Sequence, residues 1–241
     1  LGEVEHRSGD FDRAVKLYTE ATSQFRRLGD LAGAAEALRL SGITYLFTSR
    51  FEEAEATLLA ALQAFEDVED THGTAWSWQN LAWISFARGR LAQAERRIAR
   101  AVEFFERIGD ESGVAWCQGL LAYVRLHQGR LDEADTLSAT AFVDARERGE
   151  RWGEGMMLVL RASVHLWSGR TATALRRAED ALEAFRDLGD VFSQSQALAV
   201  YARALTLMGR VEDAFGVLDD AQRCVGDAPS SENLVLLIST A

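Results

Sequence analysis

Small and apolar residues recur along this chain at a fixed interval of 40 residues. Two alanine columns run through it without a slip: Ala14, Ala54, Ala94, Ala134, Ala174 and Ala214, and then Ala21, Ala61, Ala101, Ala141, Ala181 and Ala221. Within a unit, as between Ala14 and Leu28, apolar or small positions follow steps of three and four, which indicates one face of a helix. Self-similarity at such a period is typical of repeat proteins.

Two turn signals divide each 40-residue unit into two segments. The first is glycine before arginine, as in Gly89-Arg90, with Ser49 replacing the glycine in one unit. The second is glycine before aspartate, as in Gly29-Asp30. Glycine suits a left-handed C-cap and aspartate suits an N-cap. We therefore expect a helix A and a helix B in every unit, with the recurrent turn arginines capping helix A carbonyl groups.

The turn positions set the expected limits of the helices. The B helices are expected near residues 10–28, 50–68, 90–108, 130–148, 170–188 and 210–225. The A helices are expected near residues 30–48, 70–88, 110–128, 150–168, 190–208 and 231–241. A single proline in 241 residues permits long helices almost everywhere. Small residues repeated at the same crossing let neighbouring helices approach closely in every unit, so the units should stack regularly.

The motif Trp78-x-x-Leu81-Ala82, followed by Gly89-Arg90-x-x-x-Ala94 and Ala101, resembles the tetratricopeptide repeat, or TPR. The proline that usually ends helix B is missing, and each unit is about six residues longer than the common TPR. In this the chain is similar to TPR arrays of kinesin light chains, Pins-type adaptors and large bacterial signalling or transcriptional regulators. The resemblance implies an all-α, right-handed superhelical α-solenoid of about six helix-turn-helix repeats.

We expect one array over residues 1–241 that is a piece of a longer protein. In the TPR frame the chain begins and ends inside a helix A. The apolar run Leu234–Ile238 then has no helix B to cover it. Natural solenoids usually finish with a polar capping helix.

Charge and motif content narrow the function classes. The formal net charge of −11 argues against direct nucleic-acid binding by this segment. No apolar run is long enough for a membrane span, and no secretory signal is present, so we expect a cytoplasmic protein without membrane contact. Phosphate-loop, zinc-protease and serine-hydrolase motifs are missing, and the four histidines have no metal-ligand spacing. We expect no enzyme activity, no cofactor and no metal site.

The TPR resemblance implies that A helices line a concave groove and that the more acidic B helices form the outer surface. The predicted groove residues are Trp76, Gln79, Asn80, Trp83, Phe86, Trp116, Tyr123, His127, Met156, Trp167 and Arg203. Clustered tryptophan and tyrosine are typical of binding hot spots. Alternatively, Trp76, Trp83 and Trp116 fill the seams between A helices. In the family, an asparagine at the position of Asn80 often bonds the backbone of a bound peptide.

One helix A residue breaks its column. Arg161 stands where the neighbouring units have Leu81 and Leu121. Because a buried arginine must be paired, either helix B supplies a carboxylate or Arg161 turns into the groove.

The first functional hypothesis is a protein-protein interaction module that binds a peptide or protein segment in the aromatic groove. A second is the ligand-sensing or regulatory arm of a multidomain bacterial regulator. A third is a scaffold that associates with itself through its open ends.

Overall fold

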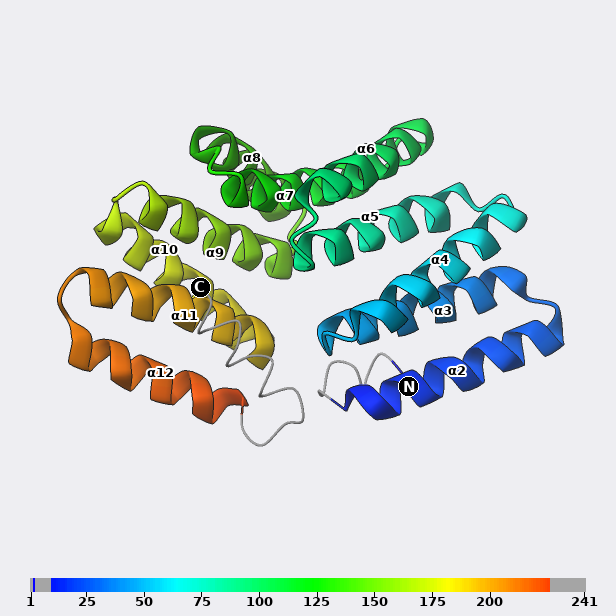
Figure 1. Cartoon of the computed structure of the whole chain (residues 1–241), viewed down its shortest axis with the longest axis horizontal. Coiled ribbons are helices and arrows are strands. Elements are labelled where there is room, and N and C mark those ends of the chain that lie inside the picture. The colour runs from blue at the N-terminus through cyan, green and yellow to red at the C-terminus, as the bar shows by residue number, and fades with distance from the viewer. Residues whose placement is uncertain (1, 3–9, 226–241) are drawn as a thin grey trace. The chain divides into compact units, whose positions relative to one another are not determined.

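The computed structural model of the chain describes residues 2 and 10–225, and within these it is helical, without a strand (Figure 1). The B helices are α2 (Phe11–Leu28), α4 (Phe51–Asp67), α6 (Leu91–Ile108), α8 (Leu131–Glu147), α10 (Thr171–Leu188) and α12 (Val211–Val225). The A helices are α3 (Leu31–Phe47), α5 (Thr71–Ala87), α7 (Glu111–His127), α9 (Arg151–Trp167) and α11 (Val191–Leu207). The helix expected over residues 231–241 lies outside the described residues.

The Gly-Asp turns work as predicted. Gly29 ends α2 in the left-handed conformation, with φ of 77°. Asp30 then caps α3, because its Oδ1 accepts a hydrogen bond of 2.8 Å from the backbone N–H of Gly33. The pairs Gly109-Asp110 and Gly189-Asp190 repeat this arrangement. At these three turns a helix B is therefore stopped and the next helix A started by adjacent residues.

The turn arginines cap helix A carbonyl groups as predicted, and they do so through the backbone. The N–H group of each donates to the carbonyl oxygen five residues earlier, over 2.8 to 2.9 Å. The arginine side chains pair with carboxylates of B helices. These pairs are Arg50–Glu53, Arg90–Glu55, Arg130–Glu133, Arg170–Asp135 and Arg210–Asp213. The cause is the acidic composition of the B helices, which places a carboxylate within reach of every turn.

Two turns hold a non-glycine residue in the left-handed region, and this leads to a stability prediction. Ser49 and Glu69 both have φ of 57°. We expect Ser49→Gly to raise the free energy of unfolding by about 0.5–1 kcal/mol, because relief of the left-handed strain exceeds the entropy that glycine adds to the unfolded chain. Ser168→Gly is the control, since Ser168 has φ of −86°. Urea denaturation measures both; stabilisation by the control but not by Ser49→Gly contradicts the prediction.

The helices group into two compact units, residues 1–120 and 121–241. Within each unit, successive A and B helices pack as antiparallel hairpins around alanine. The first alanine column is buried throughout, and the second is buried at Ala61, Ala101, Ala141 and Ala181. These small side chains lie where helices cross, which confirms the predicted all-α fold and the hairpin repeat inside each unit. The prediction of a single array over residues 1–241 stays a prediction.

The A helices are buried far more completely than the B helices. In α6 only one stripe is buried, consisting of Ala94, Ile98, Ala101 and Phe105. In α5, by contrast, most side chains are buried, because α3, α4 and α6 all pack against it. An A helix therefore exposes only a few side chains, and those that it does expose mark the surface available to a partner.

Candidate functional site

In the first unit, five of the predicted groove residues lie on α5. Gln79 and Asn80 are buried, whereas Trp76, Trp83 and Phe86 are half-buried. Trp116, on α7, is also half-buried. The rings of Trp83 and Phe86 pack edge to face, with their centroids 5.8 Å apart.

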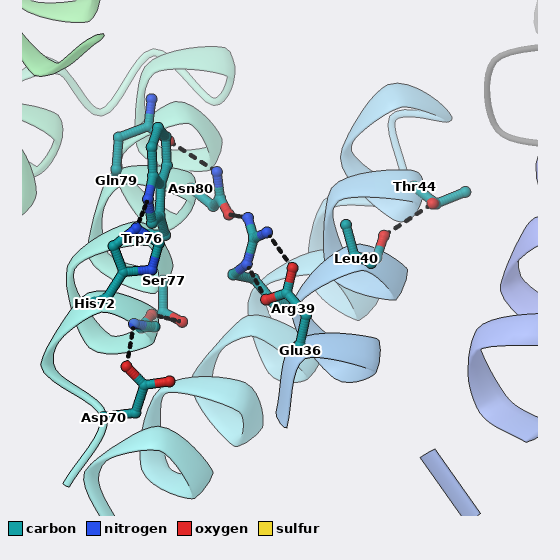
Figure 2. A network of polar contacts seen from close by, with 11 residues as sticks. Glu36, Arg39, Leu40, Thr44, Asp70, His72, Trp76, Ser77, Gln79 and Asn80 are labelled. Atoms are coloured by element: carbon teal, nitrogen blue, oxygen red, sulfur yellow. Dashed lines mark hydrogen bonds and ion pairs between the residues drawn. The ribbon is translucent and has the colours of Figure 1, made fainter. Parts of the chain in front are cut away.

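A hydrogen-bond network, here called the Arg39 network, links α5 to α3 (Figure 2). Arg39 donates through Nε and Nη2 to both oxygens of Glu36, over 2.8 and 2.6 Å, and through Nη1 to Oδ1 of Asn80 over 3.1 Å. Asn80 in turn donates through Nδ2 to Oε1 of Gln79, over 2.8 Å. The network therefore fixes the side-chain amides of two predicted groove residues between neighbouring A helices.

Arg39 and Glu36 were not among the predicted site residues. The sequence does carry a signal for Arg39, because it stands one 40-residue period before Gln79 and so occupies the same position on the preceding helix A. The sequence carries no such signal for Glu36, whose role depends on the hydrogen bonds that it accepts from Arg39.

The contacts of Trp76 agree better with the alternative that it fills a seam between helices than with a free position in a groove. Its ring meets the buried ring of Phe105 edge to face, at a centroid distance of 5.1 Å. Its Nε1–H donates to Nε2 of His72 over 3.0 Å (Figure 2). The indole is thus held on both its apolar and its polar side, by α6 and by its own helix.

In the second unit, Tyr123 and Met156 form a structural contact. The Tyr123 hydroxyl donates to the Met156 carbonyl oxygen over 3.1 Å, and burial raises the pKa of this phenol above its ordinary value. The Met156 side chain is buried. His127 is exposed at the end of α7, with Nδ1 3.0 Å from the Tyr123 carbonyl oxygen. Of these three predicted residues, His127 is exposed, Tyr123 is half-buried and Met156 is buried.

Trp167, Arg203 and Leu207 form an exposed surface, here called the Trp167 patch. The indole of Trp167, at the end of α9, is 64% exposed, which is unusual for so large an apolar side chain. The guanidinium carbon of Arg203, on α11, lies 5.4 Å from the centroid of that ring, in a cation–π arrangement. Leu207 lies one helical turn after Arg203 and is also exposed. The patch combines an apolar surface with a positive charge.

Three further observations bear on chemistry. Burial, and then the negative charge of Asp110, raise the pKa of the Cys117 thiol to about 12, so this cysteine stays a thiol at neutral pH. No group of three or more His, Cys, Asp or Glu side chains that could hold a metal ion occurs among the described residues. In the same part of the chain, no helix is both long enough and apolar enough to cross a membrane.

Comparison with known proteins agrees with this architecture. NprR in complex with its cognate peptide NprX has a TM-score of 0.75 at 14% identity, over 97% of this chain and 68% of that one. Rap protein complexed with Competence and Sporulation Factor has a TM-score of 0.73 at 14% identity, over 99% and 71% of the two chains. A signal transduction ATPase with numerous domains (STAND) from Pyrococcus horikoshii, which carries a tetratricopeptide repeat sensor, has a TM-score of 0.63 at 17% identity, over 99% of this chain and 37% of that one.

At the level of sequence, none of the curated proteins matches the chain. The sequence pattern of the tetratricopeptide repeat matches residues 1–67 and 42–107, and a second pattern with the same description matches residues 115–139. Together with the hairpins of α2 to α12, these matches show that the chain belongs to the tetratricopeptide repeat family.

Proposed function

We propose that this chain is a non-catalytic protein-interaction module and that it binds a peptide segment on the Trp167 patch. The observation that carries the proposal is the exposed indole of Trp167 on an otherwise buried helix A. Leaving an indole in water forgoes the free energy of its burial, and a partner that covers the ring recovers it. An exposed aromatic ring beside an arginine is also the residue combination found at binding hot spots.

The patch favours a ligand that is apolar with an acidic group. Leu207 and the face of Trp167 offer apolar contact, while Arg203 offers a planar set of donors that fits a carboxylate. Among the residues that the structure describes, no carboxylate lies within ion-pair distance of Arg203. A peptide with a large apolar side chain next to an aspartate, a glutamate or a free C-terminus has this chemistry.

The other predicted groove residues receive different roles in this proposal. His127, in the same compact unit as the patch, is exposed and serves as a secondary contact. Trp83, Phe86 and Trp116 are half-buried in the other unit, and we do not assign them to this patch. Gln79, Asn80, Trp76, Tyr123 and Met156 are held by the contacts described above, and we assign them to support of the A helices rather than to direct capture.

Two solved neighbours support the peptide class. NprR and Rap share the fold of this chain; the NprR structure holds its cognate peptide NprX, and the Rap structure holds Competence and Sporulation Factor. The STAND protein, in which repeats of this kind form a sensor, supports the alternative that the chain is the sensing arm of a larger regulator. The alternative of self-association through open ends depends on residues outside the described part of the chain.

The test is selection from a random peptide library displayed on phage, with the complete 241-residue chain as bait. Selected peptides should be enriched in large apolar residues next to acidic ones. Trp167→Ala should weaken binding of these peptides at least about tenfold, as expected when a hot-spot aromatic is removed. Phe215→Ala is the matched control, because Phe215 is also 64% exposed but lies on a helix B, and it should bind as the unaltered chain does.

Equal loss in both variants, no loss in Trp167→Ala, or failure to select any peptide would contradict the proposal. Thermal unfolding in the presence of single metabolites distinguishes the sensing alternative from peptide binding. A small-molecule sensor gains stability from its metabolite, and a peptide-binding module does not.

A further inference from the structure

In the described part of the chain, two equivalent polar clusters lie two repeats apart, and the polar side chains of the first are paired with one another. This first arginine cluster lies where α4, α5 and α6 meet. Arg97 donates through Nη2 to Oε1 of Glu55 over 2.5 Å, and through Nη1 to Oγ of Ser85 over 2.7 Å and to the Leu81 carbonyl oxygen over 3.0 Å. Arg88 and Arg90 each lie 3.7 Å from Oε2 of the same glutamate.

The second arginine cluster, eighty residues later, lies where α8, α9 and α10 meet. Asp135, Arg170 and Arg177 occupy the positions of Glu55, Arg90 and Arg97. Arg161 and His165 occupy those of Leu81 and Ser85. An uncharged pair in the first cluster is thus replaced by an arginine and a histidine in the second.

The acid of the second cluster, Asp135, is one methylene group shorter than Glu55, and its carboxylate makes longer contacts with the arginines around it. Nη2 of Arg170 lies 3.3 Å from Oδ2 of Asp135, and Nε of Arg161 lies 4.0 Å from Oδ1. Arg161 is therefore paired, loosely, with a carboxylate of a helix B, and it does not turn into the groove. Arg177 pairs instead with Asp180 on its own helix, over 3.2 Å.

Unsatisfied polar atoms concentrate in the second cluster. Six buried side-chain nitrogen or oxygen atoms of the described residues have no hydrogen-bond partner, and four of them belong to this one cluster. They are Nε of Arg161, Nε of Arg177, Oδ1 of Asp135 and Nδ1 of His165. His165 is only 6% exposed. Native proteins leave few buried polar atoms unpaired, so the polar groups of the second cluster are less well satisfied than those of the first.

Positive charge exceeds negative charge at this point. Three guanidinium groups face the carboxylates of Asp135 and Asp180, and Arg161 also lies over the ring of Phe142. Burial, and then the charge of Arg170, lower the pKa of His165, so its imidazole is neutral at neutral pH. Burial, and then the charge of Arg177, likewise lower the pKa of Arg161. A bound anion would offset this repulsion.

We propose that the second arginine cluster binds a phosphate group, through Arg161, Arg170, Arg177 and His165. The Arg170 and Arg177 side chains are 49% and 37% exposed, so a phosphate group can approach the cluster from solvent at these residues. The unpartnered atoms add two donors, one acceptor and an imidazole nitrogen that takes either role. Hydrogen phosphate accepts hydrogen bonds through its oxygens and donates one through its hydroxyl, which Asp135 can accept. Sulfate has the same charge and shape but no proton to donate, so the cluster discriminates against it.

The test measures thermal unfolding of the complete chain by circular dichroism at pH 7.5, in phosphate, sulfate and chloride of equal ionic strength. Phosphate should raise the melting temperature saturably and more than sulfate does, although both salts stabilise proteins generally. Arg161→Leu, which introduces the residue found at Leu81 and Leu121, should weaken the apparent phosphate affinity at least about tenfold. Asp135→Glu, which restores the longer acid of the first cluster, should also weaken it.

Arg176→Leu is the control, because Arg176 is exposed on α10 and donates to Thr173 outside the cluster; it should respond to phosphate as the unaltered chain does. O-phosphoserine, added in place of inorganic phosphate, shows whether the phosphate is free or carried on a side chain. Equal stabilisation of the unaltered chain by phosphate and sulfate, or an undiminished phosphate response in Arg161→Leu, overturns the proposal.

Discussion

Phe105→Ala is expected to lower the free energy of unfolding by about 3–5 kcal/mol, among the largest effects of any single substitution in this chain. The Phe105 side chain is completely buried at the end of α6. Its ring packs against Trp76 of α5, and it lies so close to Gly113 of α7 that a β-carbon added there would overlap it. Truncation therefore leaves a cavity bounded by backbone that cannot easily close.

The adjacent phenylalanine provides a matched control. Phe104 is half-buried, and the guanidinium carbons of Arg100 and Arg107 lie 5.4 and 5.0 Å from the centroid of its ring. Phe104→Ala removes an identical side chain one residue away and should cost no more than about 1 kcal/mol. Urea denaturation followed by far-UV circular dichroism measures both variants. Similar losses for the two would show that Phe105 does not fill the space between the helices.

The features of the fold that the sequence predicted depend on contacts repeated in every unit. Ala54, Ala94 and Ala134 recur because each stands at the same helix crossing, so the structural constraint is visible as a column. Gly29 and Asp30 are recognisable because only certain residues tolerate a left-handed C-cap or cap a helix start. The 40-residue periodicity was therefore sufficient to predict the helices and their packing as hairpins.

The candidate site was less predictable, because steps of three and four mark one face of a helix and do not say which positions along that face a neighbouring helix covers. Trp76 and Trp167 both satisfy the pattern, yet Trp76 packs on Phe105 while Trp167 is exposed. In the repeat frame Trp167 stands eleven residues, or about three helical turns, after the position of Trp76, so the two share a helix face and differ in their position along the helix. Contacts such as that of Arg39 with Asn80 join different helices, and the sequence of either helix alone does not contain them.

The same limit applies to charged residues, whose energetic role depends on burial. Arg97–Glu55 and Arg100–Glu103 have the same closest nitrogen–oxygen distance of 2.5 Å. The side chains of the first pair are only 11% and 20% exposed, whereas those of the second are 52% and 54% exposed. Water and salt screen the second pair but reach the first poorly, so equal geometry does not mean equal stabilisation.

Arg97→Met should accordingly destabilise the chain by about 2–3 kcal/mol, since it leaves Glu55 half-desolvated and Ser85 without its donor. The cost stays below that of a fully isolated buried charge because Arg88 and Arg90 remain 3.7 Å from Glu55. Arg100→Met, which breaks the exposed pair, should cost no more than about 0.5 kcal/mol.

The double variant Arg97→Met with Glu55→Gln isolates the pair from the loss of packing. We expect its loss of unfolding free energy to be smaller than the sum of the losses of the two single variants. In Arg97→Met alone, Glu55 is a buried carboxylate without its main partner, and Glu55→Gln removes that unpaired charge. Denaturation in urea at low and at high salt provides the measurement. A buried pair should keep most of its coupling energy at high salt. Additive single changes, or a coupling that high salt abolishes, would show that Arg97 and Glu55 behave as an ordinary surface pair.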